Sequence, residues 1–479
     1  MEPVTSRHSI AVDDATTQFS ATVRTFPAVD ASGKRVGSCS ATTYLRDVQD
    51  DQAQRARPVV FAFNGGPGSS STPLHLGGLA PRRAAFPTDP AAGPLTPFAV
   101  EANPDSLLDV ADLVFIDAIN TGYGESDTTD APISVYGVDG DAACFVGVIT
   151  DWLLDAGRLH SPKYLLGESY GTIRAPLVAR KLFNQATAIA VNGIVLLGQA
   201  LNLQETTQRP TNVMGTVAAL PFMAATAWYH GRSKLTAVSA DEVTRLAHEY
   251  ATTTYLTALV QGSSLDCAER HDVARRLSDF IGVPTEYLLW SRLRVHTDEF
   301  RELLLEEQQL VLGSSDARYT LPASDNRRAE SVADPATAAI TPGLMAAAAR
   351  YYREELQVEA RPYTPMDPQA FRHWVWQEDA YPNPRLGTQP SPFGAFDYAA
   401  CLSGYLKANP TAHLLIGTGL YDSLTTVGMV EHLISQNDLP ADRLHRRTYK
   451  SGHMMYTDPG ASVQLNNDLR SFITESSGL

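Results

Sequence analysis

KYLLGESYGTIRAPLVARKLF, residues 163–183, is the stretch that decides which fold we expect. Residues 163–166 predict a strand, whereas residues 173–183 are compatible with a helix. Between them stands Gly-Glu-Ser-Tyr-Gly, residues 167–171, with a glycine two positions before and two positions after Ser169. A sharp turn from strand to helix lifts a serine hydroxyl out of the sheet, and small flanking residues avoid collisions. The pattern therefore predicts that Ser169 is a nucleophile, and the start of the helix favours a developing negative charge beside it.

Short apolar runs elsewhere predict the remaining strands of a sheet. The first four of these runs are separated by stretches long enough for helical crossovers, which is typical of a mostly parallel sheet. The segment 10–44 is rich in Val, Thr and Ser and predicts antiparallel strands at one edge. We therefore expect an α/β-hydrolase fold, with a central, mostly parallel sheet flanked by helices. The apolar runs are residues 59–63, 113–116, 164–166, 193–197 and 413–416.

The pattern changes between residues 204 and 384. Helical stretches such as 240–255 and 299–311 replace the strand series there. Loops in α/β units usually have only about 2 to 6 residues, so a block of this size must be an inserted subdomain. We predict a catalytic domain of residues 1–203 and 385–479, and a mainly helical cap of residues 204–384 above its active face.

A serine nucleophile needs a histidine to accept its proton and a carboxylate to orient that histidine. In this fold the chain order is Ser, acid, His. Asp422 follows the apolar run 413–416, and His453 follows a second predicted strand, residues 446–450. Each has an ordinary alternative, since Asp422 can cap a helix that begins at Ser423 and a histidine can simply occupy a turn. Their order, each just past a strand, favours a catalytic triad.

A glycine-rich loop, Asn-Gly-Gly-Pro-Gly-Ser-Ser-Ser, occupies residues 64–71 directly after the run 59–63. A loop of this composition can also be an ordinary tight turn without a catalytic role. A dinucleotide-binding loop is a poor alternative because the GxGxxG spacing is not met and Pro67 lies inside the loop. With a nucleophile downstream, the loop is expected to offer backbone N–H groups to a tetrahedral oxyanion.

The composition of the chain argues against several classes of function. The 479 residues carry 38 basic and 53 acidic side chains, and the net charge of −15 excludes nucleic acid and anionic membranes as expected partners. The apolar runs are shorter than the roughly 18 to 20 residues that cross a bilayer. Residues 1–14 lack the apolar stretch of a secretory signal, so we expect a cytoplasmic protein.

Metal and redox chemistry are not indicated. The cysteines form no CxxC pair, so we expect buried free thiols. The other histidines have neither HxH nor HxxxH spacing, and we expect no metal and no cofactor. The cysteines are Cys39, Cys144, Cys267 and Cys401, and the histidines considered are His75, His160, His230, His248 and His373.

Three motifs together resemble the serine carboxypeptidase family, peptidase family S10, in a cysteine-poor, bacterial-type form. They lie at residues 64–71, 167–171 and 452–454. Weaker matches at residues 103–117 and 191–198 extend the resemblance through most of the catalytic part. The cap region matches less clearly.

The resemblance implies roles at individual positions. Ser169 is the implied nucleophile, His453 the general base and then acid, and Asp422 the orienting carboxylate. The backbone N–H groups of Gly66 and Tyr170 are the implied oxyanion hole.

The resemblance also implies how the substrate's end is held. Asn64, the Gly65 N–H and Glu168 are the implied ligands of a terminal carboxylate, which is why such enzymes remove one residue from the C-terminus of a peptide. A glutamate beside an anion implies a shared proton, so binding is expected to favour acidic pH.

At some positions the sequence departs from the family pattern, which limits how far the family's residue roles apply to this chain. Ser69 stands where many members have a disulfide-bonded cysteine, and Ala62-Phe63 stand where the family often has Trp-Leu. A second glutamate that commonly pairs with the elbow glutamate falls at Gly78 by ungapped counting. Arg82 or Arg83 is a candidate for supplying the missing charge complementarity.

Three functions are compatible with these residues. We expect a hydrolase that acts on a peptide or small acyl substrate with a free carboxylate. An acyltransferase or esterase that passes the acyl group to an amine or alcohol is the alternative. A binding protein that has kept the fold is disfavoured because every triad position is occupied.

Overall fold

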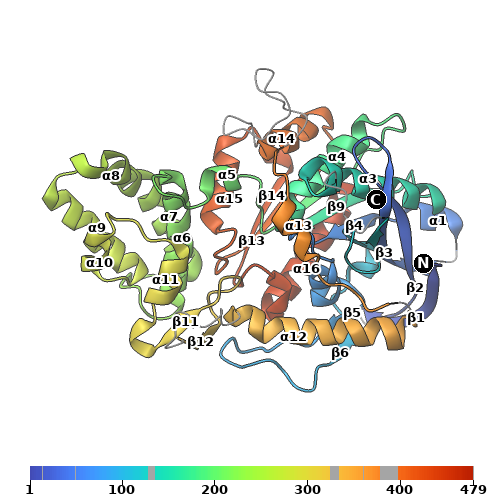
Figure 1. Cartoon of the computed structure of the whole chain (residues 1–479), viewed down its shortest axis with the longest axis horizontal. Coiled ribbons are helices and arrows are strands. Elements are labelled where there is room, and N and C mark those ends of the chain that lie inside the picture. The colour runs from blue at the N-terminus through green and yellow to red at the C-terminus, as the bar shows by residue number, and fades with distance from the viewer. Residues whose placement is uncertain are drawn as a thin grey trace.

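The computed structural model describes residues 1–12, 15–48, 50–127, 135–323, 334–359, 361–377 and 397–477. Its centre is a ten-stranded sheet with the order β1-β2-β3-β7-β4-β9-β10-β13-β14, in which β8 pairs with β3 (Figure 1). The strands from β7 to β14 run parallel, whereas β1, β2 and β3 form an antiparallel edge. The predicted α/β-hydrolase fold with its antiparallel edge is therefore confirmed. The strands are β1 (Val4–Val12), β2 (Ala15–Val29), β3 (Arg35–Arg46), β4 (Val59–Phe63), β7 (Asp112–Asp117), β8 (Glu125–Ser126), β9 (Lys163–Glu168), β10 (Gly193–Leu197), β13 (His413–Gly419) and β14 (Leu444–Tyr449).

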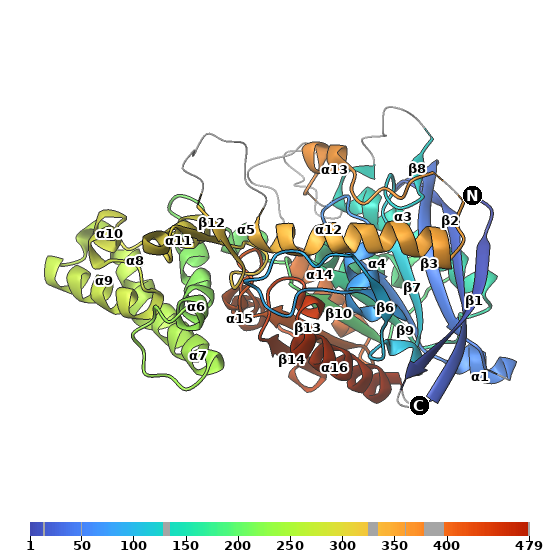
Figure 2. The same cartoon turned by 90° about the horizontal axis from the view of Figure 1, so that it is seen from below.

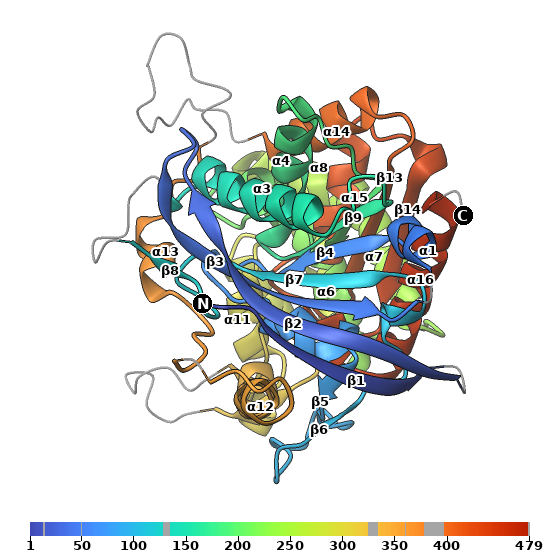
Figure 3. The same ribbon diagram turned by 90° about the vertical axis from the view of Figure 1, so that its right-hand side faces the viewer.

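The central strands are buried on both faces, which explains their continuous apolar runs. Successive side chains alternate between two cores. Phe61 and Leu165 point into one core with α3, α4, α14 and α15, whereas Val60 and Leu166 point into the other with α12 and α16. Figure 3 shows α3 and α4 on one side of the sheet and α12 on the other. The helices are α3 (Val138–Asp155), α4 (Gly171–Asn184), α12 (Pro335–Arg350), α14 (Tyr398–Ala408), α15 (Val427–Gln436) and α16 (Pro459–Ser477).

The inserted block packs in two places. Its first part, from α6 to α11 and on to Ala317, has a hydrophobic core of its own and extends to the left in Figure 1. In contrast, α12 runs along the catalytic domain, and its Leu344 and Ala347 belong to a core of the sheet (Figure 2). The block is thus not one uniform cap, and its predicted end at residue 384 lies outside the described residues. The helices of the first part are α6 (Val213–Tyr229), α7 (Ala240–Tyr250), α8 (Leu256–Gln261), α9 (Cys267–Ile281), α10 (Thr285–Trp290) and α11 (Thr297–Leu303).

Shorter elements connect these parts. None of the described helices has the length and apolar character needed to cross a membrane. The shorter elements are α1 (Asp51–Ala56), α2 (Thr72–Leu74), β5 (Arg82–Ala84), β6 (Val100–Ala102), α5 (Leu203–Thr206), β11 (Leu310–Leu312), β12 (Thr320–Pro322) and α13 (Pro368–His373).

None of the four cysteines, each of which lies among the described residues, is joined in a disulfide. Cys39, Cys144 and Cys401 are buried, as expected. Cys267 is exposed, because it is the first residue of α9 and lies on the solvent side of the inserted block. The expectation of burial is wrong at that position.

Candidate active site

Ser169 lies at the sharp turn between β9 and α4. Its φ of 58° is in the left-handed region, a conformation that costs a non-glycine residue about 1 to 3 kcal/mol and recurs at functional sites. Its N–H donates to the Leu197 carbonyl at 2.9 Å, which ties the turn to the end of β10. A Cβ on Gly167 would lie 2.1 Å from the Gly171 carbonyl oxygen, and one on Gly171 would lie 2.8 Å from the Phe63 carbonyl oxygen. The two glycines therefore let strand, turn and helix approach closely, as the sequence pattern predicts.

Asp422 and His453 form a buried pair beyond the ends of β13 and β14. The distance between His453 Nδ1 and Asp422 Oδ2 is 2.7 Å. Asp422 also accepts hydrogen bonds from the N–H groups of Leu424 and Thr425, at 2.8 and 3.1 Å, and from the Thr425 hydroxyl at 2.6 Å. The carboxylate therefore both holds the turn that follows it and orients the histidine. A fully hydrogen-bonded carboxylate fixes the Nδ1-protonated tautomer, which leaves Nε2 free to act as a base.

The His453 ring lies beside the strand that supports the serine turn. A Cβ on Gly198, the residue after β10, would lie 2.9 Å from His453 Cε1 and 3.0 Å from Nδ1. Gly198 follows Leu197, whose carbonyl accepts the Ser169 N–H. The absence of a side chain at Gly198 thus makes room for the imidazole. Ser169, Asp422 and His453 all lie past the carboxyl ends of parallel strands, β9, β13 and β14, where active sites of open α/β sheets lie.

Two charged neighbours change the protonation of His453. Burial lowers its pKa, but the ion pair and hydrogen bond with Asp422 outweigh burial, and the Glu168 carboxyl adds to their effect. The result is a pKa raised to about 9. The imidazolium is thus strongly stabilised, as a base that must carry a proton during acyl transfer requires.

The glycine-rich loop lies against the backbone of the serine turn. A Cβ on Gly65 would lie only 2.4 Å from the Tyr170 nitrogen, and Gly66 has a φ of 101°. Within the described part of the chain, no hydrogen bond takes up the N–H groups of Gly65, Gly66 or Tyr170. The structure thus brings the residues of the predicted oxyanion hole together and leaves their donors available.

Asp117, the last residue of β7, holds the far end of this loop. Its Oδ1 accepts the Ser71 N–H at 2.8 Å and the Tyr363 hydroxyl at 2.8 Å, and its Oδ2 accepts the Ser40 hydroxyl at 2.9 Å. The Ser71 hydroxyl donates to the Ile116 carbonyl. Burial raises the pKa of Asp117 to about 6 despite these three donors. The loop is therefore fixed at both ends, which preorganises its N–H groups.

Glu168, Asn64 and Tyr456 form a second buried cluster next to the nucleophile. The Asn64 amide donates to Glu168 Oε1 at 2.6 Å, and the Tyr456 hydroxyl donates to the same oxygen at 3.1 Å. Asn64 Oδ1 in turn accepts the Leu74 N–H at 3.0 Å, which fixes the amide orientation. Among the described residues, Glu168 Oε2 has no hydrogen-bond partner although it is buried. Burial raises the pKa of Glu168 to about 7, against the lowering effects of His453, Tyr456 and Asn64.

Sequence reasoning missed Tyr456, which fills the space at Gly78. A Cβ on Gly78 would lie 2.6 Å from Tyr456 Cβ, and one on Gly77 would lie 2.2 Å from the ring carbon Cε2. The position that aligns with a second glutamate therefore has no room for any side chain, and a neutral hydroxyl contacts Glu168 instead. The available signal was two adjacent glycines together with a tyrosine three residues after His453.

The two arginines proposed from the sequence do not reach this cluster. Arg82 forms an ion pair with Glu355 at 2.8 Å, and Arg83 forms one with Glu101 at 2.8 Å. Neither arginine therefore supplies a positive charge beside Glu168.

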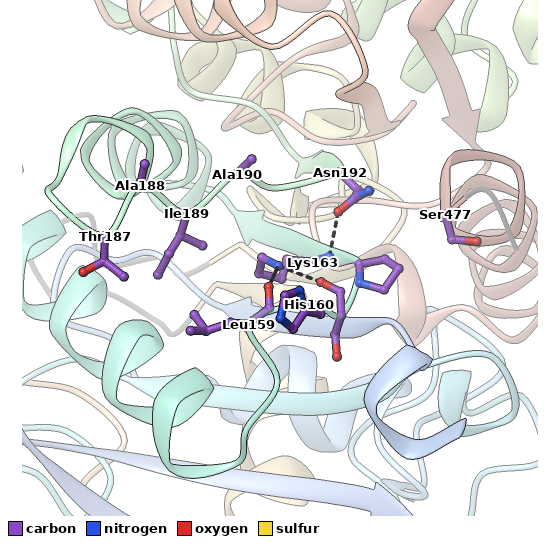
Figure 4. A pocket seen from close by; sticks show the side chains of 11 residues that line it. Leu159, His160, Lys163, Thr187, Ala188, Ile189, Ala190, Asn192 and Ser477 are labelled. Atoms are coloured by element: carbon purple, nitrogen blue, oxygen red, sulfur yellow. Dashed lines mark hydrogen bonds between the residues drawn. The ribbon is translucent and has the colours of Figure 1, made fainter. Parts of the chain in front are cut away.

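A pocket of about 490 Å³ lies at the opposite end of β9 (Figure 4). The Lys163 ammonium donates to the Leu159 and Ser161 carbonyls there, at 2.7 Å each. Because Lys163 begins the strand that Glu168 ends, the pocket is separated from Ser169 by the length of β9 and lies at the amino ends of the parallel strands. It is not part of the candidate site. Its lining residues are Leu159, His160, Ser161, Pro162, Lys163, Thr187, Ala188, Ile189, Ala190, Asn192 and Ser477.

Comparison with known proteins gives a family match over part of the chain and a fold. The family model of the serine carboxypeptidases matches residues 43–253. The crystal structure of Kex1(Δ)p, a prohormone-processing carboxypeptidase from Saccharomyces cerevisiae, is similar over 96% of this chain and 92% of its own, with a TM-score of 0.56 and 14% identity. No curated protein matches the sequence.

Other solved structures are similar to this chain with lower TM-scores. One is a carboxyl esterase from Bacillus coagulans, with a TM-score of 0.37, 11% identity and coverage of 95% and 99%. Another is a proline iminopeptidase from Mycobacterium smegmatis, with a TM-score of 0.34, 12% identity and coverage of 98% and 99%. The family match spans both the glycine-rich loop and the serine turn. Over these residues the chain is similar to the serine carboxypeptidase family, peptidase family S10, and Kex1(Δ)p shares its overall fold.

Proposed function

We propose that this protein is a serine carboxypeptidase-like hydrolase that removes the C-terminal residue of a peptide through an acyl-enzyme on Ser169. One observation carries the proposal beyond a general serine hydrolase. A buried carboxyl group with one unpartnered oxygen, Glu168 Oε2, belongs to the residue directly before the nucleophile. A protonated carboxyl there donates a hydrogen bond to a substrate carboxylate, so recognition and chemistry occur one residue apart.

In the first half-reaction, the Ser169 hydroxyl attacks the carbonyl carbon of the last peptide bond while His453 Nε2 takes its proton. The carbonyl oxygen becomes an oxyanion that accepts hydrogen bonds from the N–H groups of Gly66 and Tyr170. Asp422 stabilises the imidazolium through Nδ1. The imidazolium then protonates the departing amine as the C–N bond breaks, which releases the terminal amino acid and leaves an ester on Ser169.

In the second half-reaction, His453 removes a proton from water as its oxygen attacks the ester carbonyl. The tetrahedral intermediate collapses, the C–O bond to Ser169 breaks, and the serine oxygen recovers its proton from His453. The products are the shortened peptide and the free enzyme, and no cofactor takes part in either step.

The carboxylate of the substrate defines the cleavage position. Asn64, the Gly65 N–H and Glu168 are the proposed ligands of this group. Because Glu168 immediately precedes Ser169, a terminal carboxylate held there places the last peptide bond at the serine. Internal peptide bonds lack this charged group, so we propose exopeptidase rather than endopeptidase action.

Acyl transfer to an amine or alcohol is a second candidate function. It is favoured by Gly78, which stands where the family pattern has a second glutamate, and by the neutral Tyr456 hydroxyl that contacts Glu168. An acceptor would enter the space that the released amino acid vacates and would attack the same ester in place of water.

N-blocked dipeptides with free and with amidated C-termini test the proposal. We expect release of the last amino acid from the free acids and at least 100-fold less from the amides, since an amide cannot share the Glu168 proton. Absence of terminal release between pH 4 and 9, in a protein that labels with a fluorophosphonate, would contradict it. Added amines that divert the acyl group without hydrolysis would identify the transferase instead.

A further inference from the structure

A short segment of the inserted block, Ser314 to Arg318, lies against both loops that carry the histidine and its acid; we call it the strap. On the acid side, the N–H and hydroxyl of Ser423 donate to the Ser314 carbonyl at 3.1 and 2.7 Å. The Ala317 N–H donates to the Tyr421 carbonyl at 2.9 Å. The strap thus binds the residues on both sides of Asp422.

On the histidine side, the His453 N–H donates to the Ser315 carbonyl at 2.6 Å, and the Gly452 N–H donates to Asp316 Oδ2 at 3.0 Å. A Cβ on Gly452 would lie 2.3 Å from the Ser315 carbonyl oxygen. The close approach of the strap is therefore possible only because residue 452 is glycine. The main chain of His453 itself is held from the inserted block.

Arg318 fastens the strap to the catalytic domain. Its guanidinium pairs with Asp316, with 2.7 Å between Nη2 and Oδ2, and its Nη1 donates to the Lys450 carbonyl at 2.8 Å and to Asp458 Oδ2 at 2.9 Å. The side chains of Asp316 and Arg318 are only 5% and 8% exposed. Buried ion pairs add little stability over apolar packing, whereas they can fix a unique geometry.

The other end of the strap is anchored in the inserted block. Leu312 and Ala317 belong to that block's hydrophobic core, and the Ala317 carbonyl lies 2.8 Å from His230 Nε2 at the end of α6. The Ser314 N–H donates to Asp334, which also caps α12. The strap is therefore the point where the inserted block, α12 and the two catalytic loops meet.

We infer that the strap positions the histidine and its acid for catalysis, with Asp316 and Arg318 as positioning residues that act through the Gly452–His453 main chain. The inference rests on the proposed serine-hydrolase function. A displacement of about 1 Å at a reacting group can lower the rate about 100-fold. Loss of the Asp316–Arg318 pair should therefore lower kcat and leave substrate affinity in place.

Arg318→Gln and Asp316→Asn test the inference, with Arg318→Lys as the conservative variant. We expect kcat and the rate of fluorophosphonate labelling to fall roughly 10- to 100-fold, with KM within about twofold, and we expect Arg318→Lys to recover part of the loss. Arg275→Gln is the matched control, because Arg275 lies in the same block and pairs with Asp272 at 2.7 Å on the exposed surface of α9. It should label at the wild-type rate.

The labelling results distinguish a failure of the proposed function from a failure of the proposed role of the strap. A wild-type protein that does not label contradicts the proposed function itself. A wild type that labels together with folded Arg318→Gln and Asp316→Asn variants that label equally fast overturns the role of the strap, as does a change confined to KM. If Arg318→Gln does not fold, Ser423→Ala replaces it, since it removes one 2.7 Å hydrogen bond between strap and acid loop. Unchanged labelling of that folded variant also overturns the inference.

Discussion

The Tyr456 hydroxyl donates a hydrogen bond to Oε1 of Glu168 at 3.1 Å, and the tyrosine ring covers Gly77 and Gly78. Glu168 thus has a neutral donor as its neighbour, and Gly78 stands where the family pattern has a second glutamate. Two carboxyl groups in contact share a proton readily at acidic pH, whereas a carboxyl and a phenol do not. The tyrosine therefore separates this site from an acid-adapted carboxylate clamp.

Tyr456→Phe should strengthen the binding of free carboxylates at alkaline pH. The hydroxyl stabilises the ionised form of Glu168 and so lowers the pKa of that carboxyl; without it, more of the protein holds the proton that a ligand carboxylate needs. We expect inhibition by an N-blocked amino acid at pH 8 to become roughly fivefold tighter, the equivalent of about 1 kcal/mol. Inhibition constants measured from pH 5 to 9 check this. Weaker inhibition at every pH would mean that the hydroxyl contacts the ligand directly.

Peptide hydrolysis and fluorophosphonate labelling should respond to pH in different ways. Labelling needs neutral His453, so its rate should rise until pH passes the histidine pKa of about 9. Peptide cleavage also needs the Glu168 proton, which is lost as pH rises through about 7. The active form of the protein has Glu168 protonated and His453 neutral, so it carries one proton on the pair. The fraction of protein with one proton on the pair is nearly constant between the two pKa values. The ratio kcat/KM should therefore be flat from about pH 7 to 9 and fall on both sides. An optimum near pH 5 would contradict this assignment and restore the acidic optimum expected from the family.

Glu168→Gln should uncouple the two pH profiles. Removal of the carboxylate removes one of the charges that raise the pKa of His453, so labelling should reach its maximum at lower pH than in the wild type. The amide still offers a hydrogen-bond donor to a substrate carboxylate, so KM should lose its dependence on pH. Labelling rates and KM values across the same pH series measure both effects. Identical labelling profiles in the two proteins would show that the carboxyl does not affect the histidine.

Asp422→Asn should abolish most of the activity without unfolding the protein. An asparagine leaves the Nδ1 proton of His453 without its anionic acceptor and favours the wrong tautomer, which lowers kcat about 10³- to 10⁴-fold. Asp438→Asn is the control, since Asp438 pairs at the surface with Lys407 at 2.9 Å. Turnover of a blocked dipeptide by each variant is the measurement. Comparable turnover by the two variants would remove Asp422 from the triad.

Gly78→Ala should damage carboxylate binding from a distance. The added methyl group would collide with Tyr456 Cβ at 2.6 Å and push the ring off Glu168. We expect a stability loss of about 1 to 3 kcal/mol and a higher KM for free-acid substrates. Gly404→Ala in α14 meets no atom within 4 Å and should be neutral or slightly stabilising. Denaturant unfolding and KM values for both variants check the comparison, and an unchanged KM in Gly78→Ala would argue against the tyrosine's role.

The sequence was most informative where local geometry imposes a residue type. The serine turn requires glycines at 167 and 171, and strand burial requires the apolar runs, so both leave patterns that can be read without a structure. Asp422 and His453 could be singled out because each follows a predicted strand. The fold is therefore predictable from the residues, whereas the catalytic triad stays a prediction.

Contacts between segments that lie far apart in the sequence leave only weak patterns in it. The place of Tyr456 depends on a ring that crosses to Gly77 and Gly78, and in the sequence only that pair of glycines and the closeness of the tyrosine to His453 indicate it. The strap acts largely through main-chain carbonyls, which every residue carries. The helical pattern of α12 predicts a helix but not which core it joins, and for that reason its packing on the catalytic domain was not anticipated.

The order of strands in the sheet has a consequence for synthesis of the protein. Ser169 follows β9, but the strand beside β10 is β13, which the ribosome delivers only after the whole inserted block. Domains fold as their segments emerge, and pairings across a long stretch of chain form late. A nascent chain therefore carries its serine without a base or an acid. We expect the hydrolase to stay inert toward neighbouring nascent peptides until β13, β14 and His453 have been added.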